Sequence, residues 1–402
     1  MLSQNDYTMD ATGQRLTNKI TAADGTSRTE VYGYDELNRL TSVDYGDGET
    51  QGYTFDPMGN RLSKTDNVTG NENSAFNAAN MLLTRGSNNY TNDADGNTLT
   101  GGGRTNTWDS QNRLVSCAYN GNSSQYTYGA DGIRRRSVVN GVTTDFALDS
   151  SMFVRELRSG SSIATYLTGA SGPCYRRDDV AGTVRWYLYD GLGSVLDEVD
   201  PNGNITANRK YDVYGSVRSS TGTSTSKHKF VGALGHPSED ETGLIYMQAR
   251  YMDPATGTFA SRDAMSGGPT FLYCYDSPVN RLDPDGHLDG WLGTFVAGMC
   301  ILLAGACLEV TSIGLLWGVI AAMGGLAAVG AVLEGGGAIS LVVGLGVGSA
   351  VFGAAIGIVA AVIGVVMIAC ALAETPLGQA LLSAGASIVA HDLDLNAALQ
   401  DD

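Results

Sequence analysis

The stretch YGYDELNRL, residues 32–40, joins two tyrosines to an aspartate-led turn and an Arg-Leu pair. On an extended strand Tyr32 and Tyr34 lie on one face, because successive side chains point to opposite sides. Asp35 opens a four-residue segment that ends at Asn38, and this order favours a type I turn followed by a left-handed residue. The stretch is therefore predicted to form one β-hairpin, whose aromatic face must be covered by neighbouring hairpins.

The same pattern recurs at uneven spacing through residues 1–260. A helical interpretation fails, because Gly, Asn, Thr and Asp are frequent and no apolar stripe with a 3.6-residue period is present. The recurring unit instead predicts a β-rich array of stacked antiparallel hairpins. The copies are YTFDPMGNRL from Tyr53, WDSQNRL from Trp108 and YLYDGLGSV from Tyr187, with looser ones from Tyr7, Phe76, Tyr90, Tyr126 and Tyr211.

Charge divides the chain into two parts. Residues 1–286 hold all 25 basic residues and 34 of the 42 acidic ones, a balance of −9, and residues 287–402 hold the other eight acidic residues, a balance of −8. This acidity argues against a nucleic-acid partner, which requires a basic face. The opening MLSQNDYTMDATGQRL lacks the basic start and apolar core of a classical signal peptide. Because the chain begins within the array, we expect a fragment or a shortened member of a longer protein.

Metal and cofactor sites find little support in the sequence. The NDADGN segment from Asn92 resembles a calcium loop, but it lacks a Glu at loop position 12, and the other copies hold one acidic residue each. No cofactor is therefore expected, with calcium as the weaker alternative. The six cysteines form no Cys-x-x-Cys pair, which favours free thiols over a zinc site or a disulfide framework. They are Cys117, Cys174, Cys274, Cys300, Cys307 and Cys370.

The array resembles the YD repeats of the RHS family, which includes bacterial polymorphic toxins, the C components of insecticidal toxin complexes and the teneurins. The segment TGLIYMQARYMDPATGTFASRD, Thr242–Asp263, resembles the RHS repeat-associated core over its whole length. The resemblance implies YD repeats in residues 1–186, the core in residues 187–286 and a variable toxin segment in residues 287–402. It also implies a β-shell wall, a missing N-terminal part of that shell and a cognate immunity protein. Family shells are longer than this array, so we expect a curved wall segment and not a closed container.

The family resemblance further implies self-cleavage just after the core by an aspartyl-type mechanism. Asp263 and Asp283 match the family's two carboxylates. Two carboxylates held close together cannot both ionise cheaply, so one activates water while the other keeps its proton and polarises the scissile carbonyl. The sequence departs from the family pattern at Ala264, where a proline normally stands. By itself, the segment 283–286 also suits a plain type I turn.

The cut is expected near Gly286, His287 and Leu288, where the family pattern has its leucine directly after the glycine. Here His287 intervenes, which is a second departure. Arg281 is a candidate for holding a carboxylate or the developing oxyanion, and Asp285 is a second candidate carboxylate beside the first.

The tail is predicted to be an α-helical, membrane-type domain. Its uncharged runs, Leu292–Leu308, Val310–Leu333 and Gly335–Ala373, contain 17, 24 and 39 residues and are separated only by Glu309 and Glu334. About 20 apolar residues cross a bilayer as a helix, so the three runs suit about four transmembrane helices, the longest run forming a hairpin. A soluble, all-round hydrophobic helical core is the alternative.

Small residues recur at every fourth position in the tail, which lets helices pack closely in lipid. The tail has no Lys or Arg to set a membrane orientation, as expected for a segment that enters a target membrane after delivery. Protonation of the two glutamates would ease insertion, so acid should promote it. The small residues at this spacing include Gly314, Gly318, Ser340, Gly344, Gly348, Gly353 and Gly357, with a bend expected between the last two.

These features predict a toxin fragment whose β-wall carries a membrane-inserting, pore-forming module, secreted through a dedicated delivery system or located in the membrane. Its partners would be target lipid, the rest of the shell and the immunity protein. One alternative is a non-toxic surface or adhesive repeat protein with a membrane anchor, and another is an inactive cassette. A catalytic site in the tail is not expected, because His287 and His391 are its only histidines and it has no basic residue.

Overall fold

The computed structural model describes residues 4–22, 24–169, 172–264 and 271–287, together with the backbone of two short strands in the tail. The chain separates into two compact units, residues 1–307 and 308–402. All described side chains belong to the first unit.

The hairpin array forms two sheets in which every strand pairs antiparallel with the next strand in the chain. This order follows from the short turns, because connections of two or five residues can only join neighbouring antiparallel strands. The first sheet contains β1 (Gln4–Met9), β2 (Arg15–Thr21), β3 (Ser27–Tyr34), β4 (Leu40–Asp44), β5 (Thr50–Phe55), β6 (Arg61–Asp66), β7 (Glu72–Phe76), β8 (Leu82–Arg85) and β9 (Asn88–Asn89).

The second sheet has the same arrangement and begins at Thr91, separated by Tyr90 alone from the end of the first sheet at Asn89. We call β1 to β23 together the wall. The strands of this sheet are β10 (Thr91–Asn92), β11 (Thr98–Gly101), β12 (Arg104–Trp108), β13 (Leu114–Tyr119), β14 (Asn122–Tyr128), β15 (Arg134–Val139), β16 (Val142–Asp149), β17 (Met152–Arg158), β18 (Ser161–Gly169), β19 (Gly172–Asp178), β20 (Val184–Tyr189), β21 (Val195–Val199), β22 (Ile205–Tyr211) and β23 (Val217–Gly222).

The turns have the geometry predicted from the repeat. The Asp35 carboxylate accepts the backbone N–H groups of Leu37 at 3.0 Å and Arg39 at 2.9 Å, and Asn38 has φ 64°. The pairing register shifts between Gly33 and Tyr34, which is the bulge expected beside such a turn. The looser copies are confirmed as hairpin turns as well. In other turns the first side chain likewise accepts the backbone N–H groups two and four residues later: Asp10, Asp56, Asn77, Asp93, Asp109, Asp190, Asp200 and Asp212.

The Arg-Leu pair after the turn does not always present the same residue inward. In the first repeat quoted, Leu40 is fully buried and Arg39 binds Asp35. In the repeat from Tyr53 the pair stands one residue later, so Arg61 is buried and Leu62 is 39% exposed. A one-residue displacement on a strand exchanges the two faces, so the wall's interior receives arginines as well as leucines.

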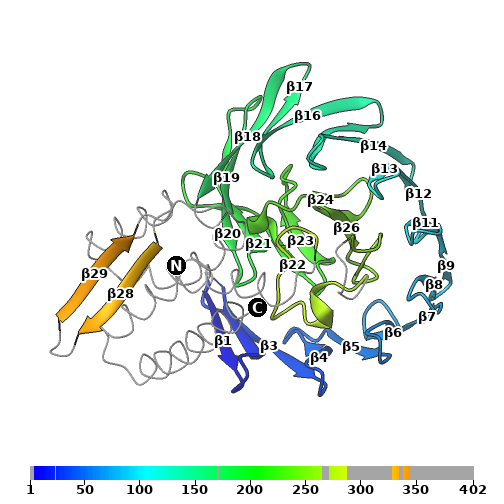
Figure 1. Ribbon diagram of the computed structural model, residues 1–402, viewed down its shortest axis with the longest axis horizontal. Helices are drawn as coiled ribbons and strands as arrows, with labels where there is room; N and C mark the ends of the chain where they lie inside the picture. The colour runs from blue at the N-terminus through cyan, green and yellow to red at the C-terminus, as the bar shows by residue number, and fades with distance from the viewer. Residues whose placement is uncertain are drawn as a thin grey trace, which may run out of the picture. The chain divides into compact units, whose positions relative to one another are not determined.

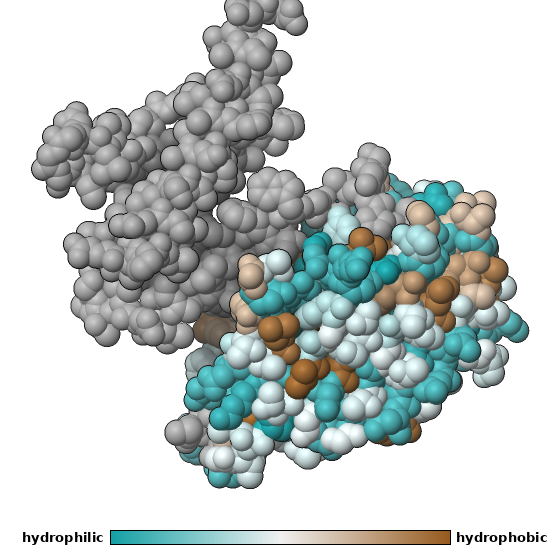
Figure 2. All heavy atoms as spheres, turned by 90° about the horizontal axis from the view of Figure 1, so that it is seen from below, coloured by the Kyte–Doolittle hydropathy of each residue, from teal (hydrophilic) through white to brown (hydrophobic). Residues whose placement is uncertain are grey.

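The outer face of the wall is solvated. In the coloured part of Figure 2, hydrophilic and neutral residues cover most of the surface, and hydrophobic residues form separate small groups. Such scattered apolar residues are normal for a protein surface. The predicted common face of Tyr32 and Tyr34 is confirmed, because both pack into one buried cluster on the inner side.

A four-stranded sheet lies inside the curve of the wall (Figure 1). Its strands are β24 (Ser238–Glu239), β25 (Leu244–Met247), β26 (Arg250–Asp253) and β27 (Thr258–Phe259). We call residues 224–264 and 271–287, which include these strands, the plug. Both hydrophobic clusters combine wall residues with plug residues, so the plug forms the centre of the core.

The wall meets its own beginning through side-chain contacts. Asp47, in the turn after β4, binds Arg218 of β23 at 2.7 Å and Lys210 of β22 at 3.2 Å. The Tyr45 hydroxyl accepts the N–H of Val213 at 3.1 Å. The wall is thus a curved segment, as expected, whose last strands also contact its start through side chains, with the plug in its interior.

Only two strands of the tail are described, β28 (Ala328–Glu334) and β29 (Ala338–Gly344), which pair antiparallel. A helix was expected at these positions, so the prediction was wrong for them. Val, Ile and Leu on both sides of a three-glycine segment also suit a β-hairpin. No helix among the described residues has the length and apolarity that crossing a bilayer requires. The expected sites Glu309, Gly348, Gly353 and Gly357 lie outside the described residues, while Glu334 and Gly344 end the two strands.

Candidate functional site

The last segment of the plug brings two aspartates to one arginine. Arg250 begins β26, Asp263 follows β27, and Asp283 lies in the segment that ends the plug. The Arg250 Nη2 atom is 2.9 Å from Asp263 Oδ2 and 3.7 Å from Asp283 Oδ2. All three side chains are at most 3% exposed. The structure thus brings together the two carboxylates that the sequence predicted.

The same guanidinium group binds a backbone carbonyl. Arg250 Nε donates a hydrogen bond to the carbonyl oxygen of Gly286, and the Gly286 N–H donates to Asp283 Oδ1 at 2.8 Å. Gly286 has φ 78°, and a Cβ atom there would lie 2.1 Å from the Met247 carbonyl oxygen. Only glycine allows the backbone to approach this closely.

Further hydrogen bonds hold the segment 283–287 against the connection between β25 and β26. The Pro284 carbonyl oxygen lies 3.1 Å from His236 Nε2 and accepts from Gln248 Nε2 at 3.2 Å. The Ala249 N–H donates to the Asp285 carbonyl oxygen at 3.0 Å. The chain bends at residues 284–287, and the Asp283 side chain accepts the Gly286 N–H there, so this segment is part of the site.

The two carboxylates have different electrostatic surroundings. Burial raises the pKa of Asp283 to about 6, against the opposing effect of Arg250. Asp263 contacts Arg250 through one oxygen, and its Oδ1 lies 2.8 Å from His287 Nδ1. This hydrogen bond raises the pKa of His287. A carboxyl group with a raised pKa, such as Asp283, can supply the proton in an acid–base pair.

The other predicted residues have different roles. The Arg281 guanidinium carbon lies 5.0 Å from the centre of the Tyr275 ring, and Arg250 takes the position expected for Arg281. Asp285 accepts the His287 backbone N–H at 3.0 Å through its side chain. Leu288 lies outside the described residues.

Arg250 was missed by the sequence analysis, although a signal was present. The segment RYMD, residues 250–253, is buried at all four positions. In the sequence, Arg250 lies among the mostly apolar residues LIYMQARYM, 244–252. A buried arginine requires carboxylate or carbonyl partners, so this position pointed to a nearby acidic site.

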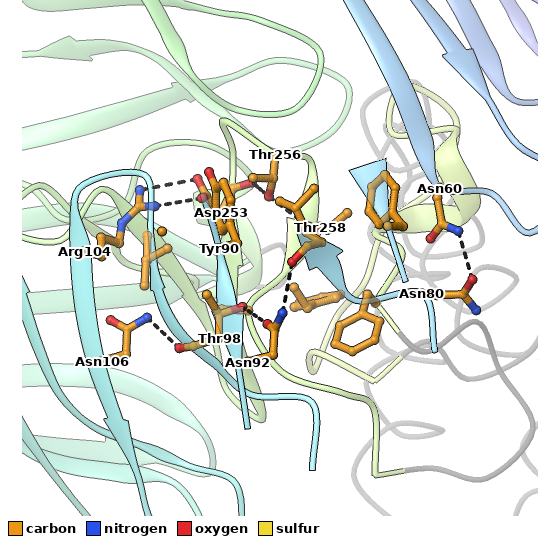
Figure 3. A pocket seen from close by; sticks show the side chains of 17 residues that line it. Asn60, Asn80, Tyr90, Asn92, Thr98, Arg104, Asn106, Asp253, Thr256 and Thr258 are labelled. Carbon is orange, nitrogen blue, oxygen red and sulfur yellow. Dashed lines mark hydrogen bonds and ion pairs between the residues drawn. The ribbon is translucent and has the colours of Figure 1, made fainter. Parts of the chain in front are cut away.

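A second cluster of polar residues joins the wall to the plug (Figure 3). Arg104 binds Asp253 of the plug at 2.7 Å, and Asn60 donates to Asn80 of the next turn at 2.9 Å. The cavity between them has a volume of about 30 Å³, which is room for roughly one water molecule. These contacts therefore serve the assembly of the fold.

In the segment that resembles a calcium loop, the Asp93 carboxylate is already hydrogen-bonded within the turn. Asp93 accepts the N–H groups of Asp95 and Asn97 through one oxygen and the Asn97 side chain through the other. Its carboxylate is therefore occupied by the turn. No group of three or more His, Cys, Asp and Glu side chains with metal-binding geometry occurs among the described residues.

The Teneurin YD-shell family model matches residues 6–268, which include the wall and most of the plug. The chain belongs to the teneurin YD-shell family. The match confirms the resemblance to RHS/YD-repeat proteins seen in the sequence.

This YD-shell chain is similar to two kinds of bacterial toxin. It is 29% identical over 270 residues to the tRNA nuclease WapA of Bacillus subtilis, a match covering 63% of the chain and 12% of that protein. It is 23% identical over 277 residues to the double-stranded DNA deaminase toxin A of Burkholderia cenocepacia, covering 67% and 16%. The chain thus spans less than a fifth of the length of either relative.

Solved structures show the same fold. The crystal structure of TcdB2-TccC3-Cdc42 matches with a TM-score of 0.60 at 19% identity, covering 75% of the YD-shell chain and 17% of the other. The Photorhabdus luminescens Tc holotoxin pore with a mutated TccC3 matches with a TM-score of 0.52 at 16% identity, covering 72% and 18%. At these identities the likeness concerns the shell fold alone.

Proposed function

We propose that the chain is the closing part of an RHS polymorphic-toxin shell that cuts its own backbone between Gly286 and Leu288 and frees the segment that follows. One observation carries this proposal: the Arg250 guanidinium group contacts Asp263 and Asp283 and also donates to the Gly286 carbonyl oxygen. A buried cation that holds two carboxylates and a peptide carbonyl suits a reaction at or beside that carbonyl.

In the proposed reaction Asp263 acts as the base and Asp283 as the acid. Asp263 takes a proton from water, and the water oxygen bonds to the scissile carbonyl carbon. Asp283 passes its proton to the carbonyl oxygen, where Arg250 stabilises the developing negative charge. The C–N bond then breaks, the amine leaves with the proton held by Asp263, and the new carboxyl group returns a proton to Asp283. One water molecule is consumed.

The test compares the full chain with the variants Asp263→Asn and Asp283→Asn, following cleavage on denaturing gels. Each substitution should slow cleavage by about 100-fold or more, because each removes one proton-transfer group. The mass of the released fragment identifies the cut bond.

Asp276→Asn is the matched control. Burial raises the pKa of Asp276 to about 8, so the residue is already neutral at pH 7 and Asn has nearly the same shape. This variant should cleave at the parent rate. Cleavage of Asp263→Asn at the parent rate would contradict the proposal.

We propose further that the freed segment is a toxin module that inserts into a target membrane. Three long uncharged runs separated only by Glu309 and Glu334, with no basic residue, support this function. A cognate immunity protein would be its neutralising partner, and the missing N-terminal repeats would complete the shell. The names of the nuclease and deaminase relatives describe proteins of which this chain spans 12% and 16%, so they do not assign an activity to the tail.

Dye release from liposomes tests membrane insertion. The cleaved protein should release dye faster at pH 5 than at pH 7.5, because protonated glutamates enter lipid more easily. The double variant Glu309→Gln and Glu334→Gln should release dye at similar rates at both pH values. No release by the parent at either pH would favour the adhesive or inactive alternatives.

A further inference from the structure

We infer that His287 is a positioning residue for self-cleavage: its hydrogen bond to Asp263 orients the catalytic carboxylate, and its charge sets the lower pH limit at which the chain cuts itself. This inference rests on the proposed cleavage and assigns a role to a residue that departs from the family pattern.

The geometry gives His287 direct contact with the base. Its Nδ1 lies 2.8 Å from Asp263 Oδ1, while Arg250 binds the other carboxylate oxygen at 2.9 Å. The Asp263 side chain is 2% exposed, whereas the His287 side chain is 27% exposed. Among the described residues, His287 is therefore the more exposed of the two side chains that bind Asp263.

The backbone directs the imidazole toward Asp263. The His287 N–H donates to Asp285 Oδ1 at 3.0 Å, which fixes the main chain at the base of the side chain. Arg250 of β26 and Asp285 also face the imidazole, and they act in opposite directions on its pKa. The hydrogen bond to Asp263 has the largest effect and raises that pKa.

The pH limit follows from the charge of the imidazole. Below the raised pKa of His287, an imidazolium and the Arg250 guanidinium both face Asp263 and keep it ionised to lower pH. Above that pKa, the neutral imidazole still donates its Nδ1–H. Losing the imidazolium should raise the pH at which Asp263 takes up a proton and cleavage falls. A nearby opposite charge typically moves a carboxyl pKa by about 1–3 units.

Cleavage of the full chain should be measured from pH 3.5 to 8 in the parent, His287→Asn and His287→Leu. Asn can donate a hydrogen bond to Asp263 but carries no charge, whereas Leu does neither. The acid midpoint of cleavage should rise by about one pH unit in both variants. The rate above that midpoint should stay near the parent value in His287→Asn and fall about tenfold or more in His287→Leu.

A residue that only packs, or only forms part of the cut sequence, would change the rate equally at every pH. An unchanged acid midpoint in both variants therefore overturns the inference, while loss of cleavage in Asp263→Asn would leave the proposed function standing. Parent-like cleavage by Asp263→Asn, or no cleavage by the parent at any pH, overturns the proposed function and the inference with it.

A second measurement does not depend on cleavage. The chain has four histidines, so labelled imidazoles can be titrated by NMR in the uncleaved Asp283→Asn protein. One imidazole, assigned through His287→Asn, should titrate above pH 6.5 and shift down by about one unit when Asp263→Asn is added. An unchanged titration after that addition overturns the inference.

Discussion

At the residue scale, the Asp35 carboxylate shows how one side chain shapes a hairpin. It accepts two backbone N–H groups within four residues and binds Arg39 at 2.7 Å. An open turn would leave these groups to water, so the aspartate stabilises the turned backbone in the same way as a helix N-cap. What makes the repeat fold is therefore an aspartate that accepts backbone N–H groups, followed three residues later by an Asn or Gly.

Asp35→Ala should lower the free energy of unfolding by about 1–2 kcal/mol, since two N–H groups lose their acceptor. Denaturant unfolding of the full chain measures the change. Asp35→Asn keeps the accepting oxygen, as Asn77 does in its own turn, and should cost less than half as much. Equal losses in both variants would show that the pairing with Arg39 matters more than the turn.

His228 is the second residue with a local consequence for stability. Its ring is buried edge-on against Tyr166 at 4.7 Å, and neither ring nitrogen has a hydrogen-bond partner among the described residues. Burial lowers the pKa of His228 to about 3, with smaller effects from His236 and Arg176. The folded state therefore requires a neutral imidazole, and stability present above pH 6.5 is lost as the pH falls toward 3.

His228→Phe should reduce the loss of stability between pH 7 and pH 5. The parent loses about 2 kcal/mol from this group over the 1.5 units below its ordinary pKa, at 1.36 kcal/mol per unit. Unfolding free energies of both proteins at the two pH values give the difference. An identical pH dependence would show that His228 finds a polar partner in solution.

At the element scale, the segment 283–287 depends on the backbone of Gly286. Because of its positive φ and its close approach to the Met247 carbonyl, the Gly286 carbonyl oxygen can accept the hydrogen bond from Arg250 Nε. The chain direction at this point is thus determined by the connection between β25 and β26, against which the segment lies.

Gly286→Ala should displace this segment, because the added Cβ would lie 2.1 Å from a carbonyl oxygen. Self-cleavage should fall about 100-fold, as expected when a reacting group moves by about 1 Å. Gly203→Ala is the control, since Gly203 also has a positive φ but nothing lies within 4 Å of its added Cβ. It should cleave at the parent rate, and equal effects of the two substitutions would contradict the proposed geometry.

At the scale of the whole molecule, the wall is held to its own start by charge. The Arg218 guanidinium binds Glu49 at 2.5 Å and Asp47 at 2.7 Å, and its carbon lies 3.5 Å from the centre of the Tyr45 ring. The arginine side chain is only 5% exposed, so these contacts are less screened than a surface pair.

Arg218→Ala should speed amide hydrogen exchange in β3–β5 and β22–β23, where the two ends of the wall meet. A double-mutant cycle with Glu49→Gln should give a coupling of about 1 kcal/mol. Arg136→Ala removes an exposed pair with Asp145 in the middle of the wall and should leave exchange at these strands unchanged. If all strands respond equally to Arg218→Ala, the contact is not specific to this junction.

The prediction from sequence succeeded where the decisive contacts are local. Asp35 and Asn38 specify a turn because the hydrogen bonds close within five residues, and the order of the wall strands follows from such turns. For the tail, a run such as residues 328–344 is compatible with helix or strand on composition alone, and its described parts are strands. Apolarity predicts burial or lipid contact but does not choose the backbone conformation.

The sequence by itself determined the hairpins, their antiparallel order and, through the family resemblance, the pair Asp263 and Asp283. Only the tertiary structure decided that Arg250 holds both carboxylates, that His287 contacts Asp263, and that Arg218 reaches Asp47. The first set depends on hydrogen bonds between near neighbours in the chain. The second joins residues up to 171 positions apart, and such contacts exist only after distant parts of the chain have packed together.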